Sequence, residues 1–177
     1  MSMIGAILVL LLLFQADTPA FPSVSGESGG IWLLSEGVWL PLPSAPVTEA
    51  KTKGFDNYIY TGGYTNLNMD ISFAGSRAAI RVINRNPVFM VERQENDGYD
   101  PVLIRLEKKK DRRICRTRPS SASAGNIQGF RRKDIIRTIL TVNPDKSFTV
   151  RPDQPLKPGE YLLVTGTLTD GRDFGVD

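Results

Sequence analysis

The sequence predicts an all-β protein, a single antiparallel β-sandwich that follows an N-terminal signal peptide. Short segments rich in Val, Ile, Thr, Phe and Tyr recur along the chain, with turn residues between them every 8 to 12 positions. No segment keeps an amphipathic helical pattern over three turns. The apolar run at the N-terminus is shorter than the roughly 20 residues that a membrane-spanning helix needs.

The N-terminal run covers residues 4–14 and is eleven residues long, which fits the apolar region of about 7 to 15 residues in a secretory signal. Thr18 and Ala20 supply the small residues of a cleavage site, so residues 1–20 are predicted to be the signal peptide and Phe21 the first mature residue. No Lys or Arg precedes the run, which leaves an uncleaved anchor or a buried N-terminal strand as the alternatives. From a signal peptide or an anchor we expect an exported protein, which is secreted, periplasmic or held in the cell envelope.

After the signal, residues 21–30 are rich in Gly and Ser and predict a flexible lead-in. Residues 31–177 predict one domain, and a domain of this size buries enough apolar surface to fold without a disulfide or a metal. Within it, residues 31–41 predict a hairpin with a three-residue turn, because two apolar runs flank Ser-Glu-Gly.

Strict alternation of apolar and polar residues predicts a strand at residues 67–73. Residues 43–65 show no clear periodicity and predict no element. Further strands are predicted from β-branched and aromatic content at 135–142, 147–150 and 161–168.

The segment Pro155-Leu156-Lys157-Pro158-Gly159-Glu160-Tyr161 resembles the corner before the penultimate strand of immunoglobulin-like and fibronectin-III-like sandwiches. It is also similar to the end of small exported bacterial proteins, from which no activity carries over. The resemblance implies an immunoglobulin-like sandwich in which Tyr161 is buried and its hydroxyl bonds to the backbone a few residues upstream. The resemblance covers about 15 residues and implies nothing about chemistry. The chain also lacks the cysteine pair of antibody domains.

Two compositional facts narrow the function. The chain has no histidine, which removes the commonest general base and metal ligand, and its one cysteine cannot form a zinc cage. No residue pattern indicates a catalytic group, a metal ion or a cofactor. We therefore expect a non-enzymatic interaction or structural module.

A basic run is the best indication of a binding site in the sequence. Residues 105–118 hold eight basic and two acidic side chains, and residues 131–133 add a second basic cluster. A hairpin with a three-residue turn at 109–111 would place Glu107 opposite Arg113, a favourable cross-strand pair. A four-residue loop would put Ile114 on the charged face, so we favour the three-residue turn. The candidate anionic-surface residues are Arg105, Lys108, Lys109, Lys110, Arg112, Arg113, Arg116 and Arg118.

Two interpretations of this hairpin stay open. Its charges keep an exposed strand edge from pairing with other chains, or they contact an acidic polymer, an anionic membrane surface or an acidic protein. Nucleic acid is not expected as the partner, because the run lacks aromatic side chains on which bases stack.

Trp32 and Trp39 lie in the first predicted hairpin. Tryptophan side chains at such positions pack in a core, or they stack on a sugar when they are exposed. The alternative function is therefore a carbohydrate-binding or carbohydrate-cleaving protein that uses these tryptophans and a pair of carboxylates.

Overall fold

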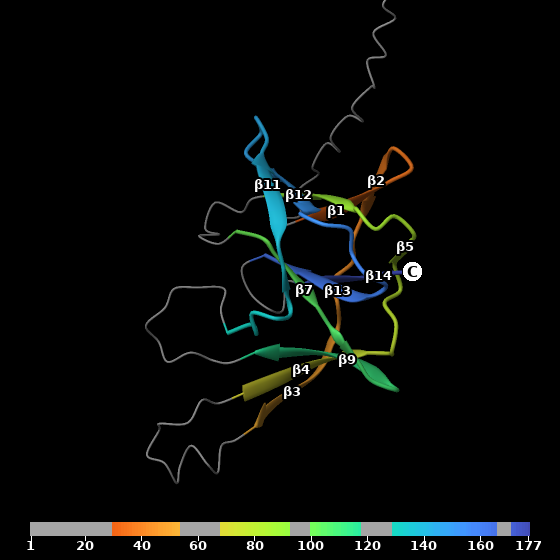
Figure 1. Cartoon of the computed structure of the whole chain (residues 1–177), viewed down its shortest axis with the longest axis vertical. Helices are drawn as coiled ribbons and strands as arrows, with labels where there is room; N and C mark the ends of the chain where they lie inside the picture. Colours follow the sequence, from red (N-terminus) through yellow and green to blue (C-terminus); the bar gives the residue numbers. More distant parts are fainter. Residues whose placement is uncertain (1–29, 54–67, 93–99, 118–128, 166–170) are drawn as a thin grey trace, which may run out of the picture.

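The computed structural model describes residues 30–53, 68–92, 100–117, 129–165 and 171–177, and every regular element in these ranges is a β-strand (Figure 1). The prediction of an all-β protein is confirmed. The predicted signal peptide, and the lead-in up to residue 29, lie outside the described residues. Within the described ranges, no helix is long and apolar enough to cross a membrane.

The first sheet, sheet A, has the strand order β11-β12-β6-β1-β2 and is antiparallel throughout. Its strands are β1 (Ile31–Ser35), β2 (Val38–Pro41), β6 (Val88–Val91), β11 (Thr138–Val142) and β12 (Phe148–Pro152). The β1–β2 turn is Glu36-Gly37, two residues rather than the predicted three, and both have positive φ. Positive φ at both positions is what a two-residue hairpin turn needs to match the strand twist.

The second sheet, sheet B, has the order β10-β7-β13-β14-β5, and its only parallel pair among the described strands is β14 with β5. Its strands are β5 (Arg81–Val82), β7 (Val102–Arg105), β10 (Ile135–Ile136), β13 (Gly159–Val164) and β14 (Arg172–Val176). The third sheet, sheet C, has the order β3-β4-β9-β8. Its strands are β3 (Val47–Lys53), β4 (Asn68–Ala74), β8 (Glu107–Lys108) and β9 (Arg112–Thr117).

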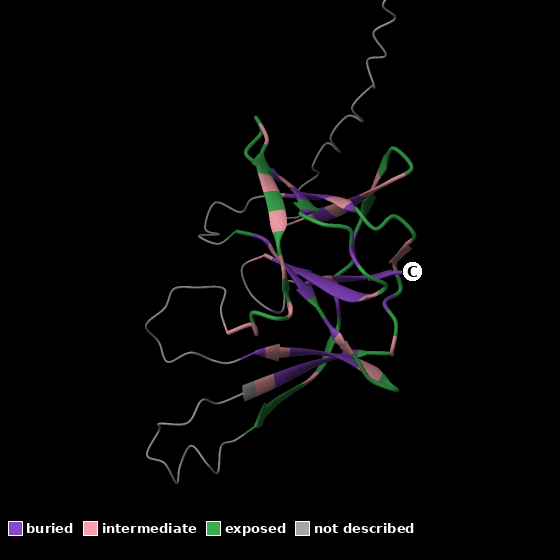
Figure 2. Ribbon diagram, in the orientation of Figure 1, coloured by how far each residue is buried: buried purple, intermediate pink, exposed green. Residues whose placement is uncertain are grey.

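Sheet B is the middle of three layers. One apolar cluster, which includes Phe89, Tyr161 and Phe174, fills the space between sheets A and B. A second cluster, which includes Phe73, Cys115 and Leu162, lies between sheets B and C. Figure 2 shows the buried strands of sheet B between the two outer sheets. The sequence predicted one sandwich, and sheet C is the layer that this prediction did not contain.

The central strand β13 shows why the middle layer is stable. Every residue from Glu160 to Val164 is buried, because one face packs on sheet A and the other on sheet C. Strands covered on both faces have continuous apolar runs instead of alternation, and Tyr161-Leu162-Leu163-Val164 is such a run.

Sheet C consists of two separate excursions of the chain. Strands β3 and β4 lie between β2 and β6 in the sequence, and strands β8 and β9 lie between β7 and β10. The two excursions meet where β4 pairs with β9, with Ile71 opposite Cys115. Together they cover the face of sheet B that points away from sheet A, and this covering layer carries the basic run.

Candidate functional site

The basic hairpin is formed by β8 and β9, but in a different register from the one we favoured. Glu107 pairs with Ile114 and Lys108 with Arg113, so the prediction that Glu107 stands opposite Arg113 is wrong. The Lys109 N–H donates to the Arg112 carbonyl at 2.8 Å, which leaves a two-residue loop. A register shift of one residue moves each side chain of a strand to the other face, so Ile114 lies on the charged outer face and Arg113 points inward.

Arg113 is buried between sheets B and C, where it forms an ion pair with Asp173 of β14. The exposed fractions of the two side chains are only 4% and 9%. The Arg113 guanidinium also donates to the Ala74 carbonyl at 2.8 Å. Burial raises the pKa of Asp173, and the nearby Arg113 charge opposes that rise. Arg113 therefore anchors sheet C to the sandwich and is not available at the surface.

On the outer face of sheet C, basic side chains form ion pairs with nearby carboxylates. Arg116 lies 3.0 Å from Glu107 and 3.5 Å from the buried Asp70, and Lys109 forms an ion pair with Glu107. The hydrogen bond from Lys109, followed by the charge of Arg116, lowers the pKa of Glu107 despite its partial burial. This carboxylate therefore stays ionised and is shared between two cations of the hairpin, Lys109 and Arg116.

Arg112 is also matched, at 3.4 Å from Glu49 of the neighbouring strand β3. Lys108 and Lys110 are exposed and form no ion pair with any described residue. Arg118 lies outside the described residues. Among the hairpin cations that the structure describes, Lys108 and Lys110 are therefore the two without an ion pair.

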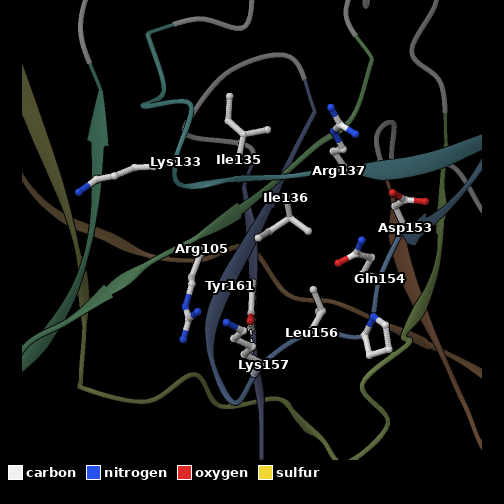
Figure 3. A pocket seen from close by; sticks show the side chains of 11 residues that line it. Arg105, Lys133, Ile135, Ile136, Arg137, Asp153, Gln154, Leu156, Lys157 and Tyr161 are labelled. Carbon is white, nitrogen blue, oxygen red and sulfur yellow. Dashed lines mark hydrogen bonds between the residues drawn. The ribbon is translucent and has the colours of Figure 1, made fainter.

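Arg105, the first residue of the predicted set, lies elsewhere. It ends β7 on the face toward sheet A, opposite Tyr161 in the register of sheet B. Its guanidinium donates to the Pro158 carbonyl at 3.1 Å. At this point a groove with a volume of about 370 Å³ opens at the edge of sheets A and B (Figure 3). The groove is lined by Arg105, Lys133, Ile135, Ile136, Arg137, Asp153, Gln154, Pro155, Leu156, Lys157 and Tyr161.

The charge of this groove is unbalanced. Four cations line it, from Arg105, Lys133, Arg137 and Lys157, against the single carboxylate of Asp153. None of these cations forms an ion pair with a residue that the structure describes. Figure 3 shows Arg105 beside Lys157 at one end, Arg137 with Asp153 and Gln154 at the other, and Lys133 extending away at the rim.

The floor of the groove is apolar and fixed by the corner before β13. Leu156 is 4% exposed, and its N–H donates to the Arg85 carbonyl at 2.7 Å. Tyr161 is buried, and its hydroxyl donates to the Lys157 carbonyl at 2.5 Å, as the sequence resemblance led us to expect for this residue. Burial raises the pKa of the Tyr161 hydroxyl, so the hydroxyl remains a donor to this turn.

The edge strands shape the rim. The chain passes directly from β10 in sheet B to β11 in sheet A, and Arg137 is the residue between them. The Asp153 N–H donates to the Arg137 carbonyl at 2.9 Å, and the Arg105 N–H donates to the Asp134 carbonyl at 2.8 Å. These bonds hold three distant segments of the chain around one opening.

Sequence reasoning identified Arg105 and the cluster at 131–133, but it missed Arg137 and Lys157. Both are single basic residues, one between two short strands and one in a turn, so neither raises the local charge density of the sequence. Within the 131–133 cluster, Arg131 forms an ion pair with Asp134 at 2.6 Å. The sequence signal that could have found Lys157 is its place in the predicted corner beside Tyr161.

The two tryptophans lie on the outer face of sheet A and do not line the groove. Both are half-buried. The Trp32 ring covers the backbone of Gly30, where an added Cβ would lie 1.9 Å from a ring carbon. Ligand stacking by Trp32 and Trp39 stays a prediction.

The other buried charges are engaged in the structure. Glu160 accepts hydrogen bonds from the Ala78 N–H and from Arg81, both at 2.7 Å. Arg81 in turn bonds to Asp177, which lowers the pKa of that carboxyl. No described residues gather three or more metal-binding side chains. These carboxylates connect β5, β13 and β14 and lie outside the lining of the groove.

No protein-family model, curated protein or solved structure matches the chain. The function has to be argued from the residues and their geometry.

Proposed function

We propose that the chain is an exported, non-enzymatic binding module that holds an anionic ligand in the groove beside Arg105. The observation that carries the proposal is the contrast in charge matching. Of the six hairpin cations that the structure describes, four have a carboxylate within 4 Å, namely Lys109, Arg112, Arg113 and Arg116. The four groove cations have none in the described part of the chain.

Unmatched cations repel one another, and an anion placed among them relieves that repulsion. A concave site strengthens the effect, because low-dielectric walls focus the field of the charges that line it. The groove also fits a binding role better than a catalytic one. Its lining has one carboxylate and no serine or cysteine, and the whole chain has no histidine.

We also infer that sheets A and B form an immunoglobulin-like sandwich. In chain order, β1, β6, β7, β11, β12, β13 and β14 take the places of the seven strands A to G. The first, second, fifth and fourth of them lie side by side in sheet A, and the third, sixth and seventh lie side by side in sheet B. This is the strand order of a constant-type immunoglobulin domain, and the hydrogen bond from Tyr161 supports a tyrosine corner. Sheet C would then be built from the A–B and C–D connections.

Retention on an anionic matrix tests the binding proposal. The purified protein is loaded at low salt and eluted with a salt gradient, since contacts among exposed charges weaken as salt rises. The groove variant replaces Arg105, Lys133, Arg137 and Lys157 with Gln. The matched control replaces Lys51, Lys108, Lys109 and Lys110 with Gln, so that both variants lose four positive charges.

We expect the groove variant to elute at clearly lower salt than the control variant, with unchanged thermal stability. The opposite order of elution would place binding on the hairpin, and failure of the unmodified protein to bind would end the proposal. Matrices bearing acidic polysaccharide, anionic lipid and acidic protein separate the three candidate partners.

Export is tested independently of binding. Mass spectrometry of the protein from its native host should show a mature N-terminus near Phe21. Intact Met1 in a cytoplasmic fraction would contradict the export proposal.

A further inference from the structure

The groove has features that narrow the class of its ligand. We propose that it takes a small amphiphilic anion, an organic phosphate or carboxylate with a hydrocarbon body. The charged group would lie between Arg105 and Lys157, and the hydrocarbon body would lie over Ile136 and Leu156. This inference rests on the proposed function, and its test is built so that the two can fail separately.

Size is the first argument. The volume of about 370 Å³ lies within the range of small-molecule sites, roughly 300 to 1,000 Å³. Such sites combine an apolar lining with a few polar groups that fix the orientation of the ligand. A flat cationic surface for a long polymer would need neither the hollow nor the apolar floor.

The floor is the second argument. Ile136 is half-buried and packs against the cluster between sheets A and B, and Ile135 at the rim is 39% exposed. Apolar side chains at the base of a hollow gain from any hydrocarbon that displaces water from them. The floor therefore favours an anion with an apolar body over a fully hydrated one.

The third argument is that one end of the groove is prepared for an anion. Arg105 is held by the Pro158 carbonyl, and a Cβ at Gly159 would lie 3.3 Å from its guanidinium, so the absent side chain lets Arg105 lie close to the turn. One of five guanidinium N–H donors suffices for that bond, which leaves others for a ligand. Figure 3 shows Lys157 at the same end, whereas the groove's one carboxylate, Asp153, lies at the opposite end beside Arg137.

Three probes separate charge from hydrocarbon: inorganic phosphate, hexyl phosphate and hexanol. Binding to the full chain is measured by calorimetry at low salt, with hexanoate as a fourth probe that tests a carboxylate head group. We expect hexyl phosphate to bind at least tenfold more tightly than inorganic phosphate, because burial of two methylenes gives about that factor. Hexanol should bind more weakly than hexyl phosphate by a similar factor or more.

Two variants test the contact with the head group and the contact with the hydrocarbon body separately. Arg105→Gln should weaken inorganic phosphate and hexyl phosphate by the same factor, because it removes only the contact with the head group. Ile136→Thr should reduce the preference for hexyl phosphate and leave inorganic phosphate unchanged. Leu140→Thr is the control, since Leu140 is also partly buried against the same cluster but lies outside the lining. Thermal melts of all three variants confirm that each is folded.

The outcomes are distinguishable. If retention on the anionic matrix depends on the groove but hexyl phosphate binds no more tightly than inorganic phosphate, the amphiphilic ligand is ruled out and the proposed function stands. If hexyl phosphate binds and Arg105→Gln leaves its affinity unchanged, the placement of the head group is wrong. If neither the matrix nor the probes bind, both proposals fail.

Discussion

Two parts of the molecule carry dense positive charge, and they differ in how that charge is matched. On the outer face of sheet C, Glu49, Asp70 and Glu107 alternate in space with the cations of β3 and β9. In the groove, the cations come from three distant segments and meet one carboxylate. The difference shows that charge density along a sequence does not reveal which cations have partners, because strand pairing decides which carboxylates lie beside them.

Arg113 provides the largest expected effect, because it belongs to the basic run by sequence and to the core by position. Asp173→Asn should lower the free energy of unfolding by about 3 to 5 kcal/mol, since it leaves the buried guanidinium of Arg113 without its carboxylate partner. Urea denaturation at neutral pH measures the loss. A loss below about 1 kcal/mol would mean that water reaches Arg113 and that it behaves as a surface cation.

Arg113→Met is the companion variant and should cost less. It leaves Asp173 without its partner, but a carboxyl whose pKa burial has already raised can take up a proton. The folded state then binds that proton more tightly than the unfolded chain does. The stability of this variant should therefore rise as the pH falls from neutral toward the usual pKa of Asp.

Tyr161→Phe tests the floor of the groove and should cost about 1 kcal/mol, the usual net contribution of one hydrogen bond. The lost bond is the one from the Tyr161 hydroxyl to the Lys157 carbonyl. Denaturant unfolding gives the value, and weaker retention on an anionic matrix would add that the turn positions Lys157. Unchanged stability would mean that the hydroxyl does not hold the corner.

Glu49→Gln combined with Glu107→Gln reduces the charge matching on sheet C. Removal of the two carboxylates frees Lys51 and Lys109, whereas Arg116 keeps Asp70 and Arg112 keeps Asp111 as a partner. The stability should change by only a few tenths of a kcal/mol, as is usual for exposed pairs, while retention on the anionic matrix should increase. Unaltered retention would show that charge matching does not govern how strongly the hairpin binds anions.

A fall in pH should also remove carboxylate charge from sheet C and should increase retention on the anionic matrix by a smaller amount. Lys109 lowers the pKa of Glu107 below its ordinary value of 4.5, so its ion pairs are intact above that value. They are lost as the pH falls through the lowered pKa in the folded state. The difference in retention between the unmodified protein and the hairpin control variant should therefore be larger at pH 3 than at pH 7.

Sequence patterns were sufficient for the strands with a clear burial signal. Alternation identified β4, and β-branched and aromatic content identified β12 and β13. They were insufficient for β3, because Val47–Lys53 is an edge strand in which Glu49 alone is not exposed. Without an apolar face there is no periodicity to detect, so no sequence pattern indicated a third sheet.

The hairpin register and the groove were missed for different reasons. A turn one residue shorter than expected reversed the faces of β9, since side chains alternate with a period of two. The groove joins Arg105, Arg137 and Lys157, which only the pairing of β10 with β7 and the turn before β13 bring together. No local sequence pattern predicts that these three residues line the same groove.

The origin of sheet C in two excursions has a consequence for how the chain folds. Neither β3–β4 nor β8–β9 is expected to persist alone, because an isolated two-stranded hairpin is at best marginally stable in water. The two hairpins must meet across the 44 residues that separate Ile71 from Cys115, and such distant pairings slow folding. Cys115 lies on the inner face of this sheet, where burial raises the pKa of its thiol to about 12. The rate at which a thiol reagent loses access to Cys115 during refolding would therefore time the closure of the third layer.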